Sequence, residues 1–524
     1  MEMIETPDEG SSNIDFKPLV NPWIIAFSVM LATFMEVLDT TVANVALPSI
    51  AGSFSASNEE STWALTSYLV SNAIVLPATA WLSSVFGRKN FFIGCIVLFS
   101  VASLLCGMAD SLHTLIFMRI LQGIGGGALQ PVSQSILLES FPPNKRGLAT
   151  AVFALGVVVA PILGPFLGGW ITDNFSWRWI FFINLPVGII ATLMSVLYIR
   201  DTKQSSSQKV KSIDYIGFGL MALAIASLQI FLDKGQQLDW FSSRFITFTA
   251  ITSLVSFIVF IIWELKVEEP IVNLKVFKNR NLTVGILSIT ALGAVLYGTI
   301  VLMPLFLQTI LGYTAQLSGM AISPRGIGSF LCILVIGKFI DRYDGRIFCA
   351  VGFVILGIAC FLLANINLSI DMASVVIPNI LSGVAMGLIF VPLTTLSFGT
   401  LKQQEFGTAA GLFNLMRNIG GSVGISLVNT LLHRFSQTHQ NYLVDKLNPY
   451  NPVFQQKVGQ LTTNFSHYTD PAHATYLAEA VIHRNLIIQS TLSAFVDNLR
   501  LFGFLCFIVV PLAFLFNKVS KKKA

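Results

Sequence analysis

The chain has 524 residues, of which 54% are hydrophobic and only 11% are charged, and its formal net charge is +5 at pH 7. Soluble domains carry roughly 25% charged residues, so this chain has too few to cover a water-facing surface, and most of its surface must face lipid. The composition excludes a soluble globular protein, gives no support to nucleic-acid binding, and predicts an all-α membrane protein.

The first residues, 1–21, form a polar and acidic tail. This tail lacks the basic start and the short apolar core of a cleaved signal peptide. We therefore expect the first apolar run, Trp23 to Leu47, to stay in the protein as its first membrane span.

The remaining apolar runs predict a polytopic protein. A spanning helix needs about 20 predominantly apolar residues. On that criterion the sequence predicts fourteen transmembrane helices, at residues 22–47, 62–84, 90–109, 112–138, 147–172, 179–199, 212–232, 244–263, 281–309, 317–340, 347–366, 372–398, 407–432 and 499–517. Lys and Arg favour cytoplasmic loops, and 21 of them lie on the side of the termini against 8 on the other side. We therefore expect both termini in the cytoplasm.

One long polar segment, 433–498, interrupts this pattern before the last span. It holds five of the six histidines and no cysteine. We expect it outside the cytoplasm, with a surface helix near Ala472 to Ile488. His433, His439, His467 and His473 have no metal-ligand spacing, so no metal site is predicted. The six cysteines lie in apolar runs and are expected to be buried and unpaired.

The sequence also repeats itself at an offset of 260 residues. The run from Arg119 to Gly127 matches the run from Asn379 to Gly387, and Gly147 to Phe153 matches Gly407 to Phe413. Repeated halves around a central site are typical of secondary transporters. We predict an N-terminal six-helix bundle at 22–199, a linker with two additional helices at 200–280, a C-terminal six-helix bundle at 281–517 that includes 433–498, and a basic cytoplasmic tail at 518–524.

Four motifs follow one another in the first half. They are Leu38 to Pro48 (LDTTVANVALP), Arg119 to Gly123 (RILQG), Gly156 to Gly169 with its prolines, and Trp177 to Gly188. Together they resemble the fourteen-span drug:proton antiporter branch of the major facilitator superfamily (EmrB/QacA type), and most of all its EmrB-type pumps.

The resemblance covers essentially the whole chain and implies the major facilitator fold, two six-helix bundles plus two extra helices. It implies a multi-pass protein of the bacterial inner membrane that exports lipophilic drugs in exchange for protons by alternating access, and so confers antibiotic resistance. It also implies a periplasmic adaptor protein and an outer-membrane channel as partners in a tripartite pump. The energy source is then the proton gradient, with no cofactor.

Three charged residues inside spans are candidates for proton coupling. A charge in a span costs at least ~2.5 kcal/mol at the bilayer centre, so it needs a partner or a hydrated cavity. Asp39 lies about 24 Å along its helix from Trp23, and burial disfavours a charged carboxylate, so we expect it to exchange protons. Glu36 lies one turn earlier on the same face and is expected to share a proton with it. Arg119 always stays charged and acts as a fixed positive centre.

The repeat supports this interpretation. At the offset of 260, Arg119 corresponds to Asn379, and Asp39 falls near Thr299. Only the first half therefore carries the two charges, whereas a salt bridge that merely held a bundle together would be expected in both halves. That purely structural role for Asp39 and Arg119 remains the alternative.

The fifth span has small residues and prolines in a fixed pattern: Gly156, Pro161, Gly164, Pro165, Gly168 and Gly169. Small residues let helices approach closely, and proline bends a helix. We expect a bent helix that seals the two halves against proton leakage, with ordinary tight packing as the alternative.

The remaining candidates concern gating and substrate. Ala80 to Lys89 keeps Gly87 and Arg88 but lacks the acid and the first Arg of the superfamily loop G-x-L-x-D-R-x-G-R-K. In the second half, Asp341 and Arg342 are the gating candidates. Four polar residues in spans are candidates for the substrate cavity: Asn44, Gln122, Arg325 and Arg417. Arg325 has snorkelling as its alternative, and Arg417 has helix packing.

No G-x4-G-K-[ST] phosphate loop occurs, so we expect an ion gradient as the energy source and no enzymatic activity. The few acids in the spans, together with Arg325, predict neutral or weakly acidic substrates over dications. Two other functions stay open: a dedicated exporter of one endogenous metabolite, siderophore or lipid, and a non-transporting membrane receptor.

Overall fold

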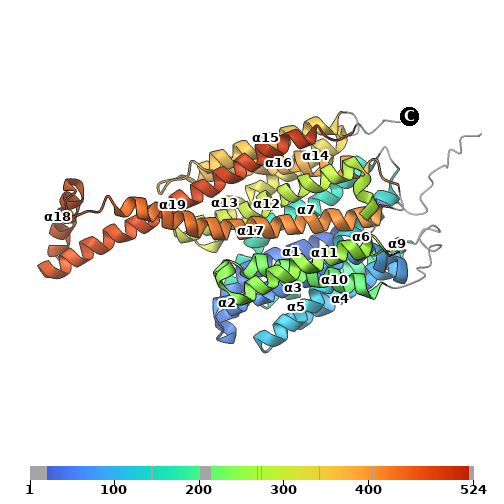
Figure 1. Cartoon of the computed structure of the whole chain (residues 1–524), viewed down its shortest axis with the longest axis horizontal. Coiled ribbons are helices and arrows are strands. Elements are labelled where there is room, and N and C mark those ends of the chain that lie inside the picture. Colours follow the sequence, from blue (N-terminus) through green and yellow to red (C-terminus); the bar gives the residue numbers. More distant parts are fainter. Residues whose placement is uncertain are drawn as a thin grey trace, which may run out of the picture.

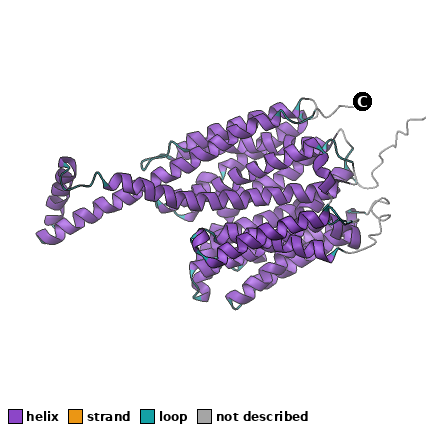
Figure 2. Cartoon of the chain, in the orientation of Figure 1, coloured by secondary structure: helices purple, strands orange, loops and turns teal. Residues whose placement is uncertain are grey.

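The computed structural model describes residues 21–142, 145–200, 214–267, 270–272, 274–340, 343–402 and 405–517. Over these residues the chain is a bundle of long helices joined by short loops, without a strand (Figure 2). Several helices begin at a side chain that caps the first turn. Asn21, Thr314 and Asp371 each accept a hydrogen bond from a backbone N–H in the turn that follows.

The first half contains nine helices among its described residues. They are α1 (Pro22–Phe54), α2 (Asn58–Ser61), α3 (Trp63–Phe86), α4 (Arg88–Gly107), α5 (Leu112–Gly127), α6 (Leu129–Ser140), α7 (Arg146–Asn174), α8 (Trp179–Phe182) and α9 (Asn184–Tyr198). The segment between the halves contributes α10 (Tyr215–Lys234), η2 (Trp240–Ser242), α11 (Arg244–Glu264) and η3 (Leu274–Lys278).

The second half consists of α12 (Arg280–Thr309), α13 (Ala315–Ile322), α14 (Pro324–Phe339), α15 (Gly345–Leu363), α16 (Met372–Phe398), α17 (Phe406–Val444), α18 (Pro452–Ser466) and α19 (Pro471–Ala513). Most predicted span ends agree with these helices to within a few residues. The exceptions are α1, α17 and α19, which continue well beyond the apolar runs that predicted them.

Twelve helical segments of the described chain are long and apolar enough to cross a membrane, and α7 is a thirteenth. It bends by 43° between Arg146–Pro161 and Leu163–Asn174, where the proline pattern predicted a bend. Helix α17 is 39 residues long, runs beside the others (Figure 1), and packs against α12, α3 and α19. It completes the fourteen predicted spans.

The segment 433–498 is helical nearly throughout, where an extended loop with one surface helix was expected. The ends of α17 and α19 project together from the bundle and carry α18 (Figure 1). His439 Nε2 lies 2.7 Å from Asp497, and Ser436 and Thr491 share a hydrogen bond of 3.2 Å. We call this segment the arm. A hydropathy criterion ends a span at the first polar stretch, although the helix itself needs no apolar residues to continue.

The two halves meet along two seams. On one, α7 packs against α13, α14 and α16, and on the other α17 packs against α3 and α6. The additional helix α10 contacts both α3 and α17 and pairs with α11. The extra pair therefore lies over the second seam, in contact with both halves.

Candidate functional site

Asp39 on α1 forms an ion pair with Arg119 on α5. The Asp39 Oδ2 and Arg119 Nη1 atoms are 2.6 Å apart, and both side chains are 1% exposed. The other carboxylate oxygen of Asp39 accepts from Gln122 Nε2 at 2.9 Å and from Asn184 Nδ2 at 2.6 Å. Two helices, α5 and α9, thus supply three donor side chains to one buried carboxylate, which satisfies its charge away from water.

Arg119 is also held by α3. Its Nε donates to the backbone oxygen of Ala64 at 3.1 Å, and its guanidinium lies 4.2 Å from the ring centroid of Tyr68, a cation–π contact. Its Nη2 has no hydrogen-bond partner in the described chain. Arg119 is therefore fixed in place, and its Nη2 remains available as a donor.

Glu36, three residues before Asp39, has a different environment. Its carboxylate accepts hydrogen bonds from Tyr68 Oη at 3.3 Å, Asn72 Nδ2 at 3.1 Å and Gln130 Nε2 at 2.5 Å, and the residue is 4% exposed. No Lys or Arg of the described residues forms a salt bridge with it. Neutral donors leave a buried negative charge only partly compensated.

The two acids therefore have separate partners. We expected Glu36 and Asp39 to share a proton, but no hydrogen bond between their carboxylates occurs in the described structure. Their connection is indirect, because Tyr68 bonds Glu36 and faces Arg119, the partner of Asp39.

Helix α6 connects this site to the second half. The side-chain oxygen of Gln130 accepts a hydrogen bond from Arg417 Nη2 on α17, while its nitrogen donates to Glu36. One turn further, Asn414 Nδ2 donates to Gln134 at 3.0 Å. Arg417 is 2% exposed, and its Nε and Nη1 have no partner in the described chain. Arg417 thus lies between the halves with free donors.

The positions of the second half that match Asp39 and Arg119 in the sequence repeat carry neutral residues. Thr299, which matches Asp39, accepts a hydrogen bond from Arg325 Nη1 at 3.1 Å, and Asn379, which matches Arg119, bonds the backbone of Val375. Arg325 is 2% exposed, so it does not snorkel to a surface. The second half lacks the ion pair but places an arginine from another helix opposite the same position.

The glycines of α7 pack against α1 next to Asp39. A Cβ at Gly164 would overlap the side chain of Thr41, and one at Gly168 would lie 3.0 Å from the backbone oxygen of Val42. Only glycine permits this approach, since the added carbon has no space. The opposite side of α7 packs against α14, so the bent helix joins the α1 site to the seam. Gly156 packs on Met30 of α1 in the same way. Pro161 lies at the bend, and Pro165 and Gly169 follow it in the segment Leu163–Asn174.

At the opposite end of the bundle from the arm, Gly87 makes the turn between α3 and α4 with a φ of 79°. Arg88 then forms a salt bridge with Glu139 at the end of α6. An acid from another helix thus pairs with the arginine of the loop whose motif lacks its own acid. Arg146 of α7 lies 5.2 Å from the ring of Phe406 on α17, across the halves. Asp341 and Arg342 lie outside the described residues.

Of the four candidates for a substrate cavity, Arg325 and Arg417 are buried and each has side-chain donors without a partner in the described chain. The other two have partners. Gln122 belongs to the Asp39 ion pair, and Asn44 is exposed and bonds the backbone of its own helix. Among the described residues there is no group of three or more His, Cys, Asp or Glu placed to hold a metal.

The sequence analysis missed the neutral polar residues of the site. Tyr68, Asn72, Gln130 and Asn184 supply most of the hydrogen bonds to the two acids. The available signal was an amide inside an apolar run, which is weaker than a charge because an amide costs less to bury.

The chain is similar to known membrane transporters in both sequence and fold. The sequence model of the Major Facilitator Superfamily matches residues 29–425. The multidrug export protein EmrB of Haemophilus influenzae is 40% identical over 483 residues, which cover 91% of this chain and 94% of that protein. The fatty acid resistance protein FarB of Neisseria gonorrhoeae is 40% identical over 452 residues, 86% of this chain and 89% of that protein. The crystal structure of the human organic anion transporter MFSD10 is similar in fold, with a TM-score of 0.57 at 13% identity, and the match covers 93% of this chain and 99% of that one.

Proposed function

The chain belongs to the major facilitator superfamily, as an EmrB-type member, and on that premise we propose that it exports lipophilic drugs across the bacterial inner membrane in exchange for protons. The names of its relatives, which include multidrug export and fatty acid resistance proteins, support export as the activity. The buried carboxylates of the first half support protons as the coupled ion.

The observation that carries proton coupling is the contrast between Asp39 and Glu36. Asp39 is neutralised by Arg119, whereas Glu36 is surrounded by neutral donors. A buried carboxylate with no cation in direct contact, which reaches Arg417 only through Gln130, is discharged most easily by taking up a proton. Glu36 is therefore the group that gains and loses the proton. Arg119, the partner of Asp39, holds the ring of Tyr68, and the hydroxyl of Tyr68 donates to Glu36.

Gln130 transmits the change to the second half. When Glu36 is charged, it holds the amide of Gln130, whose oxygen in turn holds Arg417. Protonation weakens the charge-assisted hydrogen bond and frees the seam between α6 and α17 to separate. This is the step that alternating access requires between two rigid halves.

The proton gradient is sufficient for this task. One proton that enters down 100 mV supplies about 2.3 kcal/mol, and one pH unit adds about 1.36 kcal/mol. Together they sustain roughly a few hundredfold substrate gradient per proton, because about 1.4 kcal/mol corresponds to tenfold. No cofactor enters this scheme.

The substrates we propose are neutral or weakly acidic lipophilic compounds. Arg417 has two unpaired donors in the interior and Arg325 lies buried opposite Thr299, whereas both acids of the α1 site already have donors. A dedicated exporter of one metabolite would accept only that compound. Competition among Nile red, decanoate and the dication propidium distinguishes the two cases, and strong propidium export beside weak decanoate export contradicts our assignment.

The arm supports an extracytoplasmic partner. It lies at the opposite end of the molecule from the described C-terminus (Figure 1), so it faces the periplasm if both termini are cytoplasmic. Tyrosine is enriched at protein interfaces, and four highly exposed tyrosines lie on the arm: Tyr442, Tyr450, Tyr468 and Tyr476. We propose that the arm binds a periplasmic adaptor that leads to an outer-membrane channel.

The decisive experiment measures substrate-induced proton movement in proteoliposomes of the purified chain. The wild type should release or take up protons when substrate is added, and Glu36→Gln should abolish this movement while still binding substrate. Wild-type proton movement in the E36Q protein would remove Glu36 from the mechanism. Transport by the wild type without any proton movement would remove proton coupling itself.

A further inference from the structure

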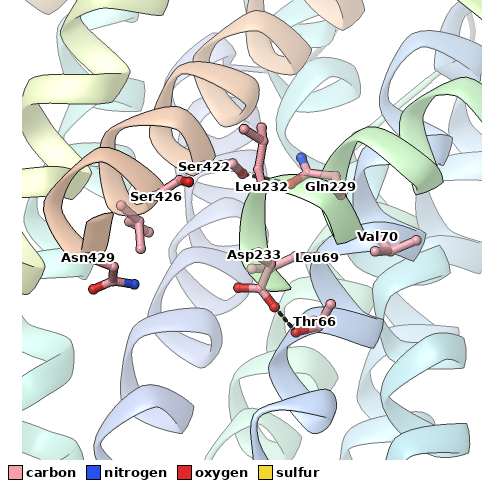
Figure 3. Close-up of a pocket in the computed structure, with 10 residues that line it drawn as sticks. Thr66, Leu69, Val70, Gln229, Leu232, Asp233, Ser422, Ser426 and Asn429 are labelled. Atoms are coloured by element: carbon pink, nitrogen blue, oxygen red, sulfur yellow. Dashed lines mark hydrogen bonds between the residues drawn. The ribbon is translucent and has the colours of Figure 1, made fainter. Parts of the chain in front are cut away.

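A small cavity lies where α10 crosses the seam between α3 and α17 (Figure 3). Its volume of about 30 Å³ has room for about two water molecules, so it is too small for a drug. Six of its ten lining residues are polar: Thr66, Gln229, Asp233, Ser422, Ser426 and Asn429. A polar cavity of this size is suited to water and to the protons that water carries.

Asp233 is the one ionisable group among the described residues that line the cavity. Its carboxylate accepts a hydrogen bond from the hydroxyl of Thr66 on α3 (Figure 3). The charge of the neighbouring Lys234 acts on Asp233. Its ammonium donates to Thr62 and, at 3.0 Å, to Gln237, and lies 5.0 Å from the ring of Trp63. Neither α3 nor α17 contributes a charged side chain to the lining.

From the cavity a line of polar residues leads to Glu36, joined by hydrogen bonds except between the backbone oxygen and the side chain of Asn418. Ser422 donates to the side chain of Gln229 at 2.7 Å and lies 3.2 Å from the backbone oxygen of Asn418. The amide of Asn418 donates to Asn72 at 3.4 Å. Asn72 in turn donates to Glu36 at 3.1 Å. The line crosses from the extra helix through the second half to the first.

The exposure of these residues decreases along the line. Asp233 is exposed, Ser422 and Asn418 are partly buried, and Asn72 and Glu36 are 3% and 4% exposed. The line therefore begins at a carboxylate that solvent can reach and ends at a carboxylate that it cannot. Asp233 is the second-to-last residue of α10, whose end lies at the same end of the bundle as the arm.

We propose that this cavity is the port through which protons reach Glu36 from the arm side, with Asp233 as the group that receives them. A hydronium ion gives its proton to an Asp233 oxygen and becomes water. The proton then passes to water in the cavity and, through further water molecules beside Asn418 and Asn72, to a Glu36 oxygen, and Asp233 is again a carboxylate. The amides and hydroxyls align the water and are not consumed. The inference rests on the proposed proton-coupled function.

This port gives the two additional helices a role. Without α10 the seam between α3 and α17 would face lipid at this level, where a hydrated path cannot exist. Helix α10 covers the seam and contributes Gln229 and Asp233 to the cavity wall.

The test uses the full chain in proteoliposomes with a pH-sensitive dye inside, driven by Nile red or decanoate, whichever gives the larger wild-type signal. Asp233→Asn should slow proton movement about tenfold, a modest part of what a positioned proton-transfer group contributes. Binding of the substrate, measured by tryptophan fluorescence, should stay unchanged. Lowering the pH on the arm side by one unit should restore much of the D233N rate, since direct protonation from solution then replaces the port.

The matched control is Asp239→Asn, an exposed acid five residues beyond α10 that does not line the cavity, and it should behave as the wild type. Equal rates of proton movement in the wild type, D233N and D239N would overturn the proposal that the cavity is a proton port. So would a D233N rate that acid does not restore, because the carboxylate would then be merely structural. If D233N fails to fold, Ser422→Ala decides by the same two criteria. A wild type without proton movement instead overturns the proposed function, and the two failures are thus distinct.

Discussion

Gln130 and Arg417 belong to opposite halves of the molecule, yet the guanidinium of Arg417 donates a hydrogen bond to the side-chain oxygen of Gln130. The nitrogen of the same amide donates to Glu36. An amide has a donor end and an acceptor end, so it can join a carboxylate to a guanidinium in one fixed orientation. A change in the charge of Glu36 therefore alters the hydrogen bonds of Gln130, and through them the position of Arg417 in the second half.

Replacing Gln130 should uncouple transport from binding. Gln130→Leu removes a donor from Glu36 and an acceptor from Arg417, and each buried group left unsatisfied costs about 1–3 kcal/mol. We expect substrate binding to persist in detergent while proton-driven uptake into vesicles falls at least about tenfold. Gln134→Leu is the control, since Gln134 bonds Asn414 on the same helices without touching Glu36. Equal losses in both variants would assign Gln130 to packing alone.

The Asp39–Arg119 pair should be more sensitive to the loss of one partner than of both. Asp39→Asn leaves a buried, uncompensated arginine and should destabilise the protein by about 3–5 kcal/mol. The double variant Asp39→Asn with Arg119→Met should recover part of that loss, because no charge then remains buried. Thermal unfolding in detergent measures both. A double variant less stable than the single one would show that Arg119 is needed chiefly for its contacts with Ala64 and Tyr68.

The close approach of α7 and α1 should tolerate no side chain at Gly164. Gly164→Ala places a carbon against Thr41, and overpacking of this kind costs about 1–3 kcal/mol. Gly94→Ala on α4 is matched to it, since nothing lies within 4 Å of the added carbon. There the change should stabilise the helix by up to about 1 kcal/mol. Unfolding temperatures that shift in the same direction for both variants would contradict the packing described here.

Arg417 should discriminate between substrates by charge. Arg417→Gln removes the two unpaired donors and the positive charge, so the affinity for decanoate should fall about tenfold, equivalent to about 1.4 kcal/mol. The affinity for the neutral Nile red should change little. Equilibrium binding to the purified protein measures both, and parallel losses for the two ligands would mean that Arg417 supports the fold and not the substrate carboxylate.

Removing the arm should separate transport from assembly. Ser436 and Thr491 are in hydrogen-bond contact, so a short Gly-Ser linker can replace the residues between them and leave the spans in place. The shortened protein should still exchange substrate for protons in vesicles. In cells it should lose resistance. The proposed periplasmic adaptor should co-purify with the full chain and not with the shortened protein. Undiminished adaptor recovery would place the docking surface elsewhere on the molecule.

The sequence predicted the fold and singled out Asp39 and Arg119 because apolar runs and the charges inside them are unusual enough to stand out. It did not predict that Glu36 and Asp39 have separate partners, since the positions of Asn72 and Gln130 relative to them depend on tertiary packing. The segment of the arm was predicted, but its nearly continuous helices were not, because hydropathy detects spans and not helices as such. Asp233 was missed for a related reason, as it directly follows the predicted span 212–232 and so resembled an ordinary loop acid.

One continuous helix, α17, carries both Arg417 at the seam and the base of the arm. From Arg417 to Val444 it extends about 40 Å at 1.5 Å per residue. A stiff rod of that length is a lever: a tilt of about 10° at the seam displaces its far end by about 7 Å. Whatever binds the arm would therefore be moved mechanically each time the halves change their relative position. Under the proposed assembly, this movement would time the opening of the attached channel to each turnover.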